Sequence, residues 1–191
     1  LIVRYYGNQA QAENTGQVFA SVRFGNVIGS SGSVVPLFRE QISGGGPITL
    51  THDDMTRYFM SVREAAELII QAGALSSGGD ILMLEMGEAV RIRDLAENMV
   101  LLAGLSVKDA NNPDGDIEIV TVGIRDGEKL HEELFYDPQG VSATRHPKIL
   151  RAQRRVNGLD HLPGSIDELR SLIEKQDAEG IRKLLYTIAA S

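Results

Sequence analysis

Apolar and polar residues follow two different periods along this chain. Apolar positions at helical spacing predict helices over the ranges 1–14, 34–43, 62–75, 92–104, 127–135, 165–176 and 177–189. Runs rich in β-branched residues predict strands over 18–29, 47–51, 81–86 and 117–123. Because strand-like and helix-like segments alternate, the sequence predicts an α/β fold with parallel strands.

Three helix starts carry local signals. Ser61 and Glu64 have the spacing of a capping box, in which each side chain bonds the other residue's backbone amide, so a helix should begin at residue 62. Ser165 and Glu168 repeat that spacing and predict a second box. Pro36 lies in the expected first turn of the helix over 34–43, where proline is well tolerated.

The polar stretch 137–147 indicates one boundary. It separates a mixed α/β part, residues 1–150, from a mostly helical tail, residues 151–191. Because the tail is short, we expect an appendage and not a second domain.

Composition narrows the class of protein. Of 191 residues, 42% are hydrophobic and 24% are charged, which is typical of a chain with a real core. Acidic residues outnumber basic ones 26 to 19, for a net charge of −7, so we expect no nucleic-acid partner. The absence of Cys excludes a disulfide and favours a cytoplasmic location. No apolar run approaches the roughly 18 residues that a membrane span needs.

The loop 24–36 is the first candidate for chemistry. Its glycines and serines let a ligand approach the backbone, and it leads into a helix start whose free amides favour a phosphate. Asn26 offers both a donor and an acceptor. The alternative is an ordinary Gly-rich turn between a strand and a helix.

Two arginines are further candidates. Arg57 follows a loop and could hold a pyrophosphate with paired hydrogen bonds, or it could be a surface residue paired with Asp53 or Asp54. Arg125 stands in a turn just after a strand, where open α/β sheets contact ligands. In the same turn Glu128 could accept hydrogen bonds from ribose hydroxyls. Alternatively, that turn is a helix start capped by Asp126.

Several reactive motifs are missing. None of the four histidines has the spacing of a metal-binding pair, so we expect no metal site. The chain also contains no Gly-rich dinucleotide loop, no Tyr-x-x-x-Lys and no G-x-S-x-G. We therefore expect a binding portion without catalytic residues of its own.

Taken together, the motifs resemble one family. They are VRFGNVIGSSGSVVPLF (22–38), PITLTHDDMTRYFMSVREAAELI (47–69), DILMLEMGEAVRIRDLA (80–96) and GIRDGEKLHEEL (123–134). This succession is similar to the C-terminal half of extended short-chain dehydrogenase/reductases that act on nucleotide sugars. It most resembles the CapD-like polysaccharide biosynthesis proteins, the UDP-N-acetylglucosamine 4,6-dehydratase group. The resemblance covers about residues 1–150 and implies part of a Rossmann-type fold with a substrate-binding lobe.

The resemblance implies a role for each candidate residue. Asn26, Arg57 and Arg125 would bind the diphosphate, and Glu128 would bind ribose. Phosphate would also meet the helix start at Ser33 and Val34, and the uracil ring would lie against Pro47 and Thr49. The nicotinamide ring would pass the loop formed by Phe24, Gly25, Asn26 and Val27.

Two positions depart from the family pattern. Asp53 and Asp126 stand where the family usually has Pro. Either carboxylate could loosen its turn or place negative charge beside an anionic ligand. The cofactor loop and the proton-transfer residues of the family would lie upstream of residue 1.

The implied parent protein is an NAD(P)-dependent UDP-N-acetylglucosamine 4,6-dehydratase-like lyase of capsular or surface polysaccharide biosynthesis. This chain would hold the UDP-sugar but neither bind NAD or NADP alone nor turn over substrate. A UDP-sugar epimerase fragment and a non-catalytic nucleotide-sugar-binding or assembly module are the alternatives. The segment 144–150 is similar to membrane-anchored members, which implies a parent at the cytoplasmic face of the inner membrane. An exposed strand edge would favour a homo-oligomer.

Overall fold

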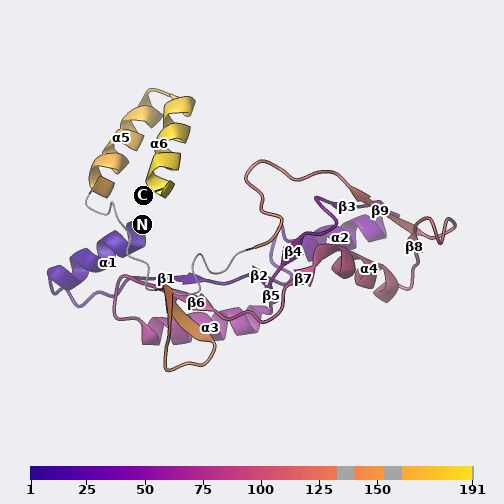
Figure 1. Ribbon diagram of the computed structural model, residues 1–191, viewed down its shortest axis with the longest axis horizontal. Coiled ribbons are helices and arrows are strands. Elements are labelled where there is room, and N and C mark those ends of the chain that lie inside the picture. The colour runs from indigo at the N-terminus through magenta and orange to yellow at the C-terminus, as the bar shows by residue number, and fades with distance from the viewer. Residues whose placement is uncertain (133–139, 153–160, 191) are drawn as a thin grey trace. The chain divides into compact units, whose positions relative to one another are not determined.

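The structure is a computed structural model that describes residues 1–132, 140–152 and 161–190 (Figure 1). The chain divides into two compact units, and each is built from separated stretches. Unit 1 comprises Leu1–Val22, Ala72–Leu82 and Asp137–Ser191, and unit 2 comprises Arg23–Gln71 and Met83–Tyr136. Unit 1 thus holds both the first helix and the helical tail. Among the described residues, no helix has the length and apolarity required to cross a membrane.

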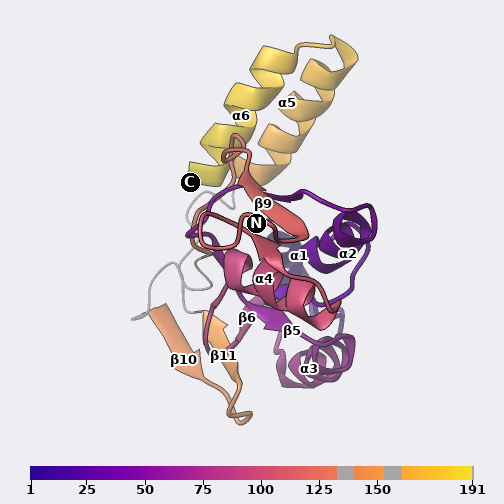
Figure 2. The same ribbon diagram turned by 90° about the vertical axis from the view of Figure 1, so that its right-hand side faces the viewer.

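Unit 1 contains a four-stranded sheet and three helices. The strand order is β1-β6-β11-β10, and the bounds are β1 (Ala20–Arg23), β6 (Asp80–Leu84), β10 (Val141–Ala143) and β11 (Ile149–Ala152). Strands β10 and β11 form an antiparallel hairpin with Ser142 opposite Arg151 (Figure 2). The helices are α1 (Ile2–Ala12), α5 (Leu162–Glu174) and α6 (Ala178–Ala190). Helices α5 and α6 pack against each other.

Two sequence predictions in these stretches need correction. The predicted strand 18–29 is two short strands, β1 and β2 (Asn26–Val27), because the chain between them turns to pair with a different partner. Helix α5 begins at Leu162, before the predicted capping box. The Ser165 hydroxyl donates to the His161 carbonyl instead of capping a helix start, so the box predicted there was wrong.

Unit 2 is built on short, mostly parallel strand pairs. Its elements are β2, α2 (Val34–Ser43), β3 (Ile48–Leu50), β4 (Thr56–Arg57), β5 (Phe59–Met60), most of α3 (Val62–Leu75), β7 (Val90–Arg91), α4 (Ile92–Leu102), β8 (Val107–Lys108) and β9 (Ile117–Thr121). Strands β3, β9 and β8 form a parallel sheet, β2 pairs with β5 in parallel, and β4 pairs with β7 antiparallel. The predicted α/β class with parallel strands is confirmed.

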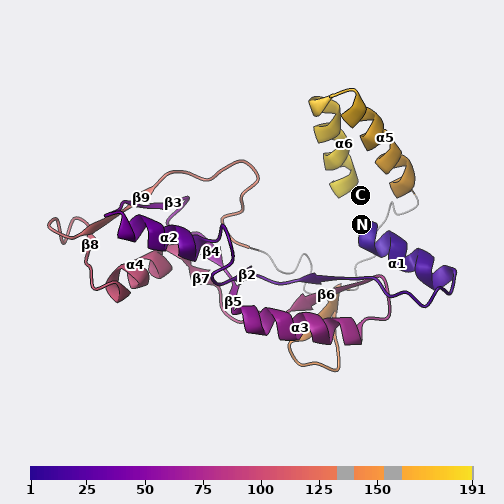
Figure 3. The same cartoon turned by 180° about the vertical axis from the view of Figure 1, so that it is seen from behind.

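The core of unit 2 lies between two helices and the β3–β9–β8 sheet. Helices α2 and α4 pack against each other and against β3, as the two opposite views show (Figures 1 and 3). Phe38 of α2, Ile48 of β3, Val100 of α4 and Ile117 of β9 are almost completely buried there. This cluster holds the strands whose ends carry the candidate site.

Two helix predictions in unit 2 have opposite outcomes. The capping box of α3 is confirmed, since the Ser61 amide donates to Glu64 Oε2 over 2.8 Å and the Glu64 amide donates to Ser61 Oγ over 3.2 Å. The helix predicted over 127–135 is wrong for its described part, 127–132. The Lys129 and Leu130 carbonyls accept hydrogen bonds from Arg57 and Thr56, so they are not available to a helix.

Candidate functional site

Asn26 lies on a strand that fits closely against its neighbour. Its amide donates to the Tyr58 carbonyl over 2.7 Å, and it stands opposite Phe59 in the parallel β2–β5 pair. Gly25 is buried beside it, and a Cβ at that position would lie 2.5 Å from the Tyr58 carbonyl oxygen. Among the described residues, the Asn26 side chain has no hydrogen-bond partner, so its amide group is available to a ligand.

The start of α2 leaves several donors unused. Ser33 is the N-cap residue, with extended backbone at φ −80° and ψ 165°, but its side chain makes no capping bond. Its Oγ is buried and has no hydrogen-bond partner among the described residues. The amides of Val34 and Val35, at the first two helical positions, have no acceptor within the helix. The predicted first-turn position of Pro36 is confirmed.

Arg57 holds the segment that contains Glu128. Its guanidinium donates to the Leu130 carbonyl over 3.2 Å and to the Lys129 carbonyl over 2.9 Å. Nη2 also lies 3.7 Å from Glu128 Oε1, and the Arg57 side chain is only 16% exposed. The alternative pairing with Asp53 or Asp54 is wrong. Nη1 also donates to the Thr56 carbonyl over 2.7 Å, so Nε and one Nη2 hydrogen remain for a ligand.

Arg125 and Glu128 close a tight turn. The Glu128 amide donates to the Arg125 carbonyl over 3.0 Å, and Gly127 supplies the positive φ of 84° that such a turn requires. This turn replaces the helix start that Asp126 was expected to cap. Arg125 is exposed, and its guanidinium has no partner within the described parts of the chain. The same turn thus carries the Arg125 guanidinium and the Glu128 carboxylate, whose Oε2 accepts from the Arg125 backbone amide over 3.4 Å.

The residues expected near uracil lie on the parallel sheet. Pro47 is exposed and precedes β3, and Thr49 pairs with Val120 of β9. Gln41 of α2 donates to Thr49 Oγ1 over 2.8 Å and accepts from the Thr49 amide over 3.1 Å. The side chain and the amide of Thr49 are thus already bonded to α2.

Hydrogen bonds and one ion pair connect some of the predicted residues. Arg57, Glu128 and Arg125 form one contiguous group, and Asn26 joins it through the backbone of Tyr58. No hydrogen bond or ion pair within the described residues joins that group to Ser33, Val34, Pro47 or Thr49. Around Asn26, the side chains of Phe24 and Val27 are half-buried.

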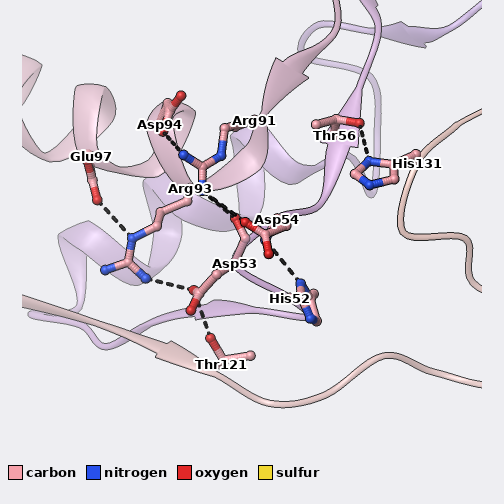
Figure 4. A network of polar contacts seen from close by, with 10 residues as sticks. All are labelled: His52, Asp53, Asp54, Thr56, Arg91, Arg93, Asp94, Glu97, Thr121 and His131. Carbon is pink, nitrogen blue, oxygen red and sulfur yellow. Dashed lines mark hydrogen bonds and ion pairs between the residues drawn. The ribbon is translucent and has the colours of Figure 1, made fainter.

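A polar network that was not predicted from the sequence surrounds Asp53, four residues before Arg57 (Figure 4). Asp53 Oδ1 accepts from Arg93 over 2.7 Å and from the Thr121 hydroxyl over 3.0 Å. These two hydrogen bonds hold the pKa of the Asp53 carboxyl below its ordinary value of 3.8, and the bond to Asp53 raises the pKa of Arg93. The Arg93–Glu97 pair, at 3.0 Å, has the i,i+4 spacing that a sequence can show. The pairing of Asp53 with Arg93 has no such signal.

A second branch of the network holds β4 in place. Arg91 lies 3.2 Å from Asp54 and 3.8 Å from Asp94. Across the strand, Thr56 Oγ1 is 3.0 Å from His131 Nδ1 (Figure 4). The described residues contain no group of His, Asp and Glu side chains that could hold a metal ion.

Comparison with known proteins places the chain in a family. Residues 2–154 match the family described as "Polysaccharide biosynthesis protein". The chain belongs to this family. A relative within it, the capsular polysaccharide biosynthesis protein CapD of Staphylococcus aureus, is 52% identical over 141 residues, which cover 74% of this chain and 22% of that protein.

Two enzymes at greater distance match this polysaccharide biosynthesis chain about equally. The UDP-N-acetylglucosamine 4,6-dehydratase (inverting) of Campylobacter jejuni is 35% identical over 61% of this chain and 31% of that protein. The UDP-glucose 4-epimerase of Rickettsia rickettsii is 34% identical over 71% of this chain and 37% of that protein.

A solved structure, Pen from Bacillus thuringiensis, matches with a TM-score of 0.64 and 30% identity, over 81% of this chain and 46% of that one. The predicted fold class, part of a Rossmann-type short-chain dehydrogenase/reductase, is confirmed. This polysaccharide biosynthesis chain spans less than half of each relative named here.

Proposed function

We propose that unit 2 binds the UDP moiety of a nucleotide sugar for an NAD(P)-dependent UDP-N-acetylglucosamine 4,6-dehydratase-like enzyme of surface polysaccharide biosynthesis. The observation that carries this is the grouping of Arg57, Glu128 and Arg125, in which Glu128 lies 3.7 Å from one guanidinium and in the same turn as the other. Two guanidinium groups suit a diphosphate, and a carboxylate suits ribose hydroxyls.

Each residue has a distinct task in the proposed complex. The guanidinium of Arg125, which has no partner among the described residues, would bind one phosphate, and the remaining Arg57 donors would bind the other. The side-chain amide of Asn26 would donate to a bridging or terminal oxygen. The amides at the start of α2, beside Ser33 and Val34, would also favour an anion. Pro47 and Thr49 would face the uracil ring.

The chemistry of the whole enzyme needs groups beyond this set. In the proposed parent reaction a hydride leaves C4 of the sugar, water is lost across C5 and C6, and the hydride returns to C6. NAD or NADP would accept and return that hydride. Phe24, Gly25, Asn26 and Val27 would line the path of the nicotinamide ring, a fit supported by the half-buried side chains around Asn26.

The cofactor and the catalytic groups are proposed to come from outside this sequence. It holds no Gly-rich dinucleotide loop and no Tyr-x-x-x-Lys. We therefore propose that the chain alone neither binds NAD(P) nor turns over substrate. Turnover of UDP-N-acetylglucosamine by the chain with added cofactor would overturn this. We propose that the parent protein is anchored at the cytoplasmic face of the inner membrane and forms homo-oligomers.

Isothermal titration of the chain with UDP tests the proposed binding. We expect UDP to bind, and Arg125→Ala to weaken binding at least about tenfold, because a charged phosphate contact contributes about 1.5–3 kcal/mol. Arg125 is a better probe than Arg57, since Arg57→Ala would also release the Lys129 and Leu130 carbonyls. Arg182→Ala, an exposed change of the same charge on α6, is the matched control. Absence of UDP binding, or equal affinities for all three proteins, would contradict the proposal.

A UDP-sugar epimerase is the second candidate, favoured by the similar identity to the Rickettsia rickettsii enzyme. The product of the parent enzyme separates the two. A dehydratase yields a 4-keto-6-deoxy sugar nucleotide, whereas an epimerase yields the C4 epimer with its hydroxyl at C6 intact. If UDP binds and the parent enzyme changes neither carbon, the third alternative, a non-catalytic binding or assembly module, is favoured.

A further inference from the structure

A single carboxylate joins the two segments that carry the proposed site (Figure 4). Asp53 lies in the turn between β3 and β4, four residues before Arg57. Its Oδ1 accepts from the hydroxyl of Thr121, the last residue of β9, over 3.0 Å. The segment that follows Thr121 contains both Arg125 and Glu128. Asp53 is therefore bonded to the start of the segment that presents these two side chains.

The far end of the same segment is held independently. Arg57 donates to the carbonyls of Lys129 and Leu130, and the Thr56 amide also donates to Leu130. At the near end, the Val122 amide donates to the Leu50 carbonyl over 2.7 Å. The segment is thus attached at its near end to β3 and at its far end to β4. Asp53 makes the side-chain attachment at the near end.

Arg93 compensates the charge of this carboxylate. Its guanidinium lies 2.7 Å from Asp53 Oδ1, and Glu97 lies 3.0 Å from the same guanidinium. The Asp53 side chain is 49% exposed, and ion pairs that exposed contribute little to stability. We therefore expect Asp53 to determine where the end of β9 lies and to contribute little to the stability of the unit.

We propose that Asp53 is a positioning residue for the nucleoside diphosphate site, setting the place of Arg125 and Glu128 through its hydrogen bond to Thr121. This rests on the proposed function of the same residues. From the sequence, the Asp53 carboxylate could place negative charge beside an anionic ligand. The positioning role gives this carboxylate a favourable effect on the same site. The charge is paired with Arg93, and the hydrogen bond to Thr121 orders the site.

Electrostatics and positioning predict opposite signs for one substitution. Asp53→Ala removes a negative charge and leaves Arg93 without that partner, so charge alone would tighten the binding of anionic UDP. Positioning predicts weaker binding, by about tenfold, since small misplacements of a binding group lose much of its contribution. Asp53→Asn keeps an acceptor oxygen at the same place, and its affinity should stay within about threefold of wild type.

A double-mutant cycle, measured as UDP affinity, tests whether Asp53 acts through its hydrogen bond to Thr121. Thr121→Val removes the hydroxyl without changing shape, and it should weaken UDP binding as Asp53→Ala does. The double variant should be no weaker than either single one, because both changes remove the same bond. Thr121→Ser, which retains the hydroxyl, should bind UDP like wild type. Glu67→Ala, which removes an exposed carboxylate from its pair with Arg63 on α3, outside this network, is the control.

The outcomes separate the two levels of inference. If wild type does not bind UDP, the proposed function fails. If wild type binds and Asp53→Ala binds equally or more tightly, the positioning role fails while the site stands. If the losses of UDP affinity caused by Asp53→Ala and Thr121→Val multiply in the double variant, Asp53 does not act through Thr121. Should Asp53→Ala fold poorly, Thr121→Val against Thr121→Ser decides the same question.

Discussion

Gly25 should not tolerate even the smallest side chain. A Cβ at this position would lie 2.5 Å from the Tyr58 carbonyl oxygen and 2.7 Å from the Tyr58 Cβ. These atoms belong to Tyr58, the single residue between β4 and β5, so they cannot move aside as the end of a flexible side chain would. Gly25→Ala must therefore push β2 away from its parallel partner and stretch the 2.7 Å bond from the Asn26 amide to the Tyr58 carbonyl.

The cost has two parts. Overpacking of this kind costs about 1–3 kcal/mol, and weakening a backbone hydrogen bond adds about 0.5–1.5 kcal/mol. We therefore expect Gly25→Ala to lower the free energy of unfolding by about 2–4 kcal/mol and to weaken UDP binding through Asn26. Urea unfolding followed by circular dichroism measures the first effect, and calorimetric titration measures the second.

A matched glycine makes the measurement decisive. Gly73 lies within α3, and a Cβ there meets nothing within 4 Å. Gly73→Ala should therefore stabilise the chain by up to about 1 kcal/mol, because alanine is the better helix former. Equal unfolding free energies for Gly25→Ala and wild type would refute the steric reasoning. If Gly25→Ala is destabilised but binds UDP with unchanged affinity, the proposed role of Asn26 in UDP binding is refuted.

Three further changes should have measurable effects. Ile48→Ala, at a fully buried position, should cost about 2–5 kcal/mol in urea unfolding, whereas Ile70→Ala, at a position 73% exposed, should change little. Ser61→Ala removes one side of the α3 capping box and should cost about 1 kcal/mol, with a matching loss of helical signal on heating. Hydrogen bonds from Ser106 lower the pKa of Asp116 below 3.8, so this carboxylate stabilises the fold above that pH and ceases to do so as pH falls through its folded value. Asp116→Asn should therefore flatten the acid side of the stability profile, and an unchanged profile would contradict this.

Local signals predicted the elements that depend on local contacts. The α3 capping box and the helices predicted over 34–43 and 92–104 follow from residues a few positions apart. The structure contains all three, with the last helix ending at Leu102. The segment 127–132 shows the opposite case. Leu130 and Leu134 have helical spacing in the sequence. The carbonyls of Lys129 and Leu130 nevertheless accept hydrogen bonds from Arg57, which lies far away in sequence.

The candidate site divides in the same way. The turn that joins Arg125 to Glu128 was visible as a short motif with a glycine, although it was not distinguishable from a helix cap. The hydrogen bond between Asp53 and Thr121 joins residues 68 positions apart, and no motif near either residue in the sequence predicts it. Such contacts depend on how the β3–β9 pair is assembled, which periodicity does not describe.

The order of β3 and β9 along the chain has a consequence during synthesis. Ile48 of β3 pairs with Ile119 of β9, so a ribosome completes β3 about seventy residues before its partner exists. At about 5–20 residues per second, an apolar strand remains unpaired for roughly 4–14 seconds on the nascent chain. That interval gives a cellular chaperone both a hydrophobic segment to recognise and the time to bind it.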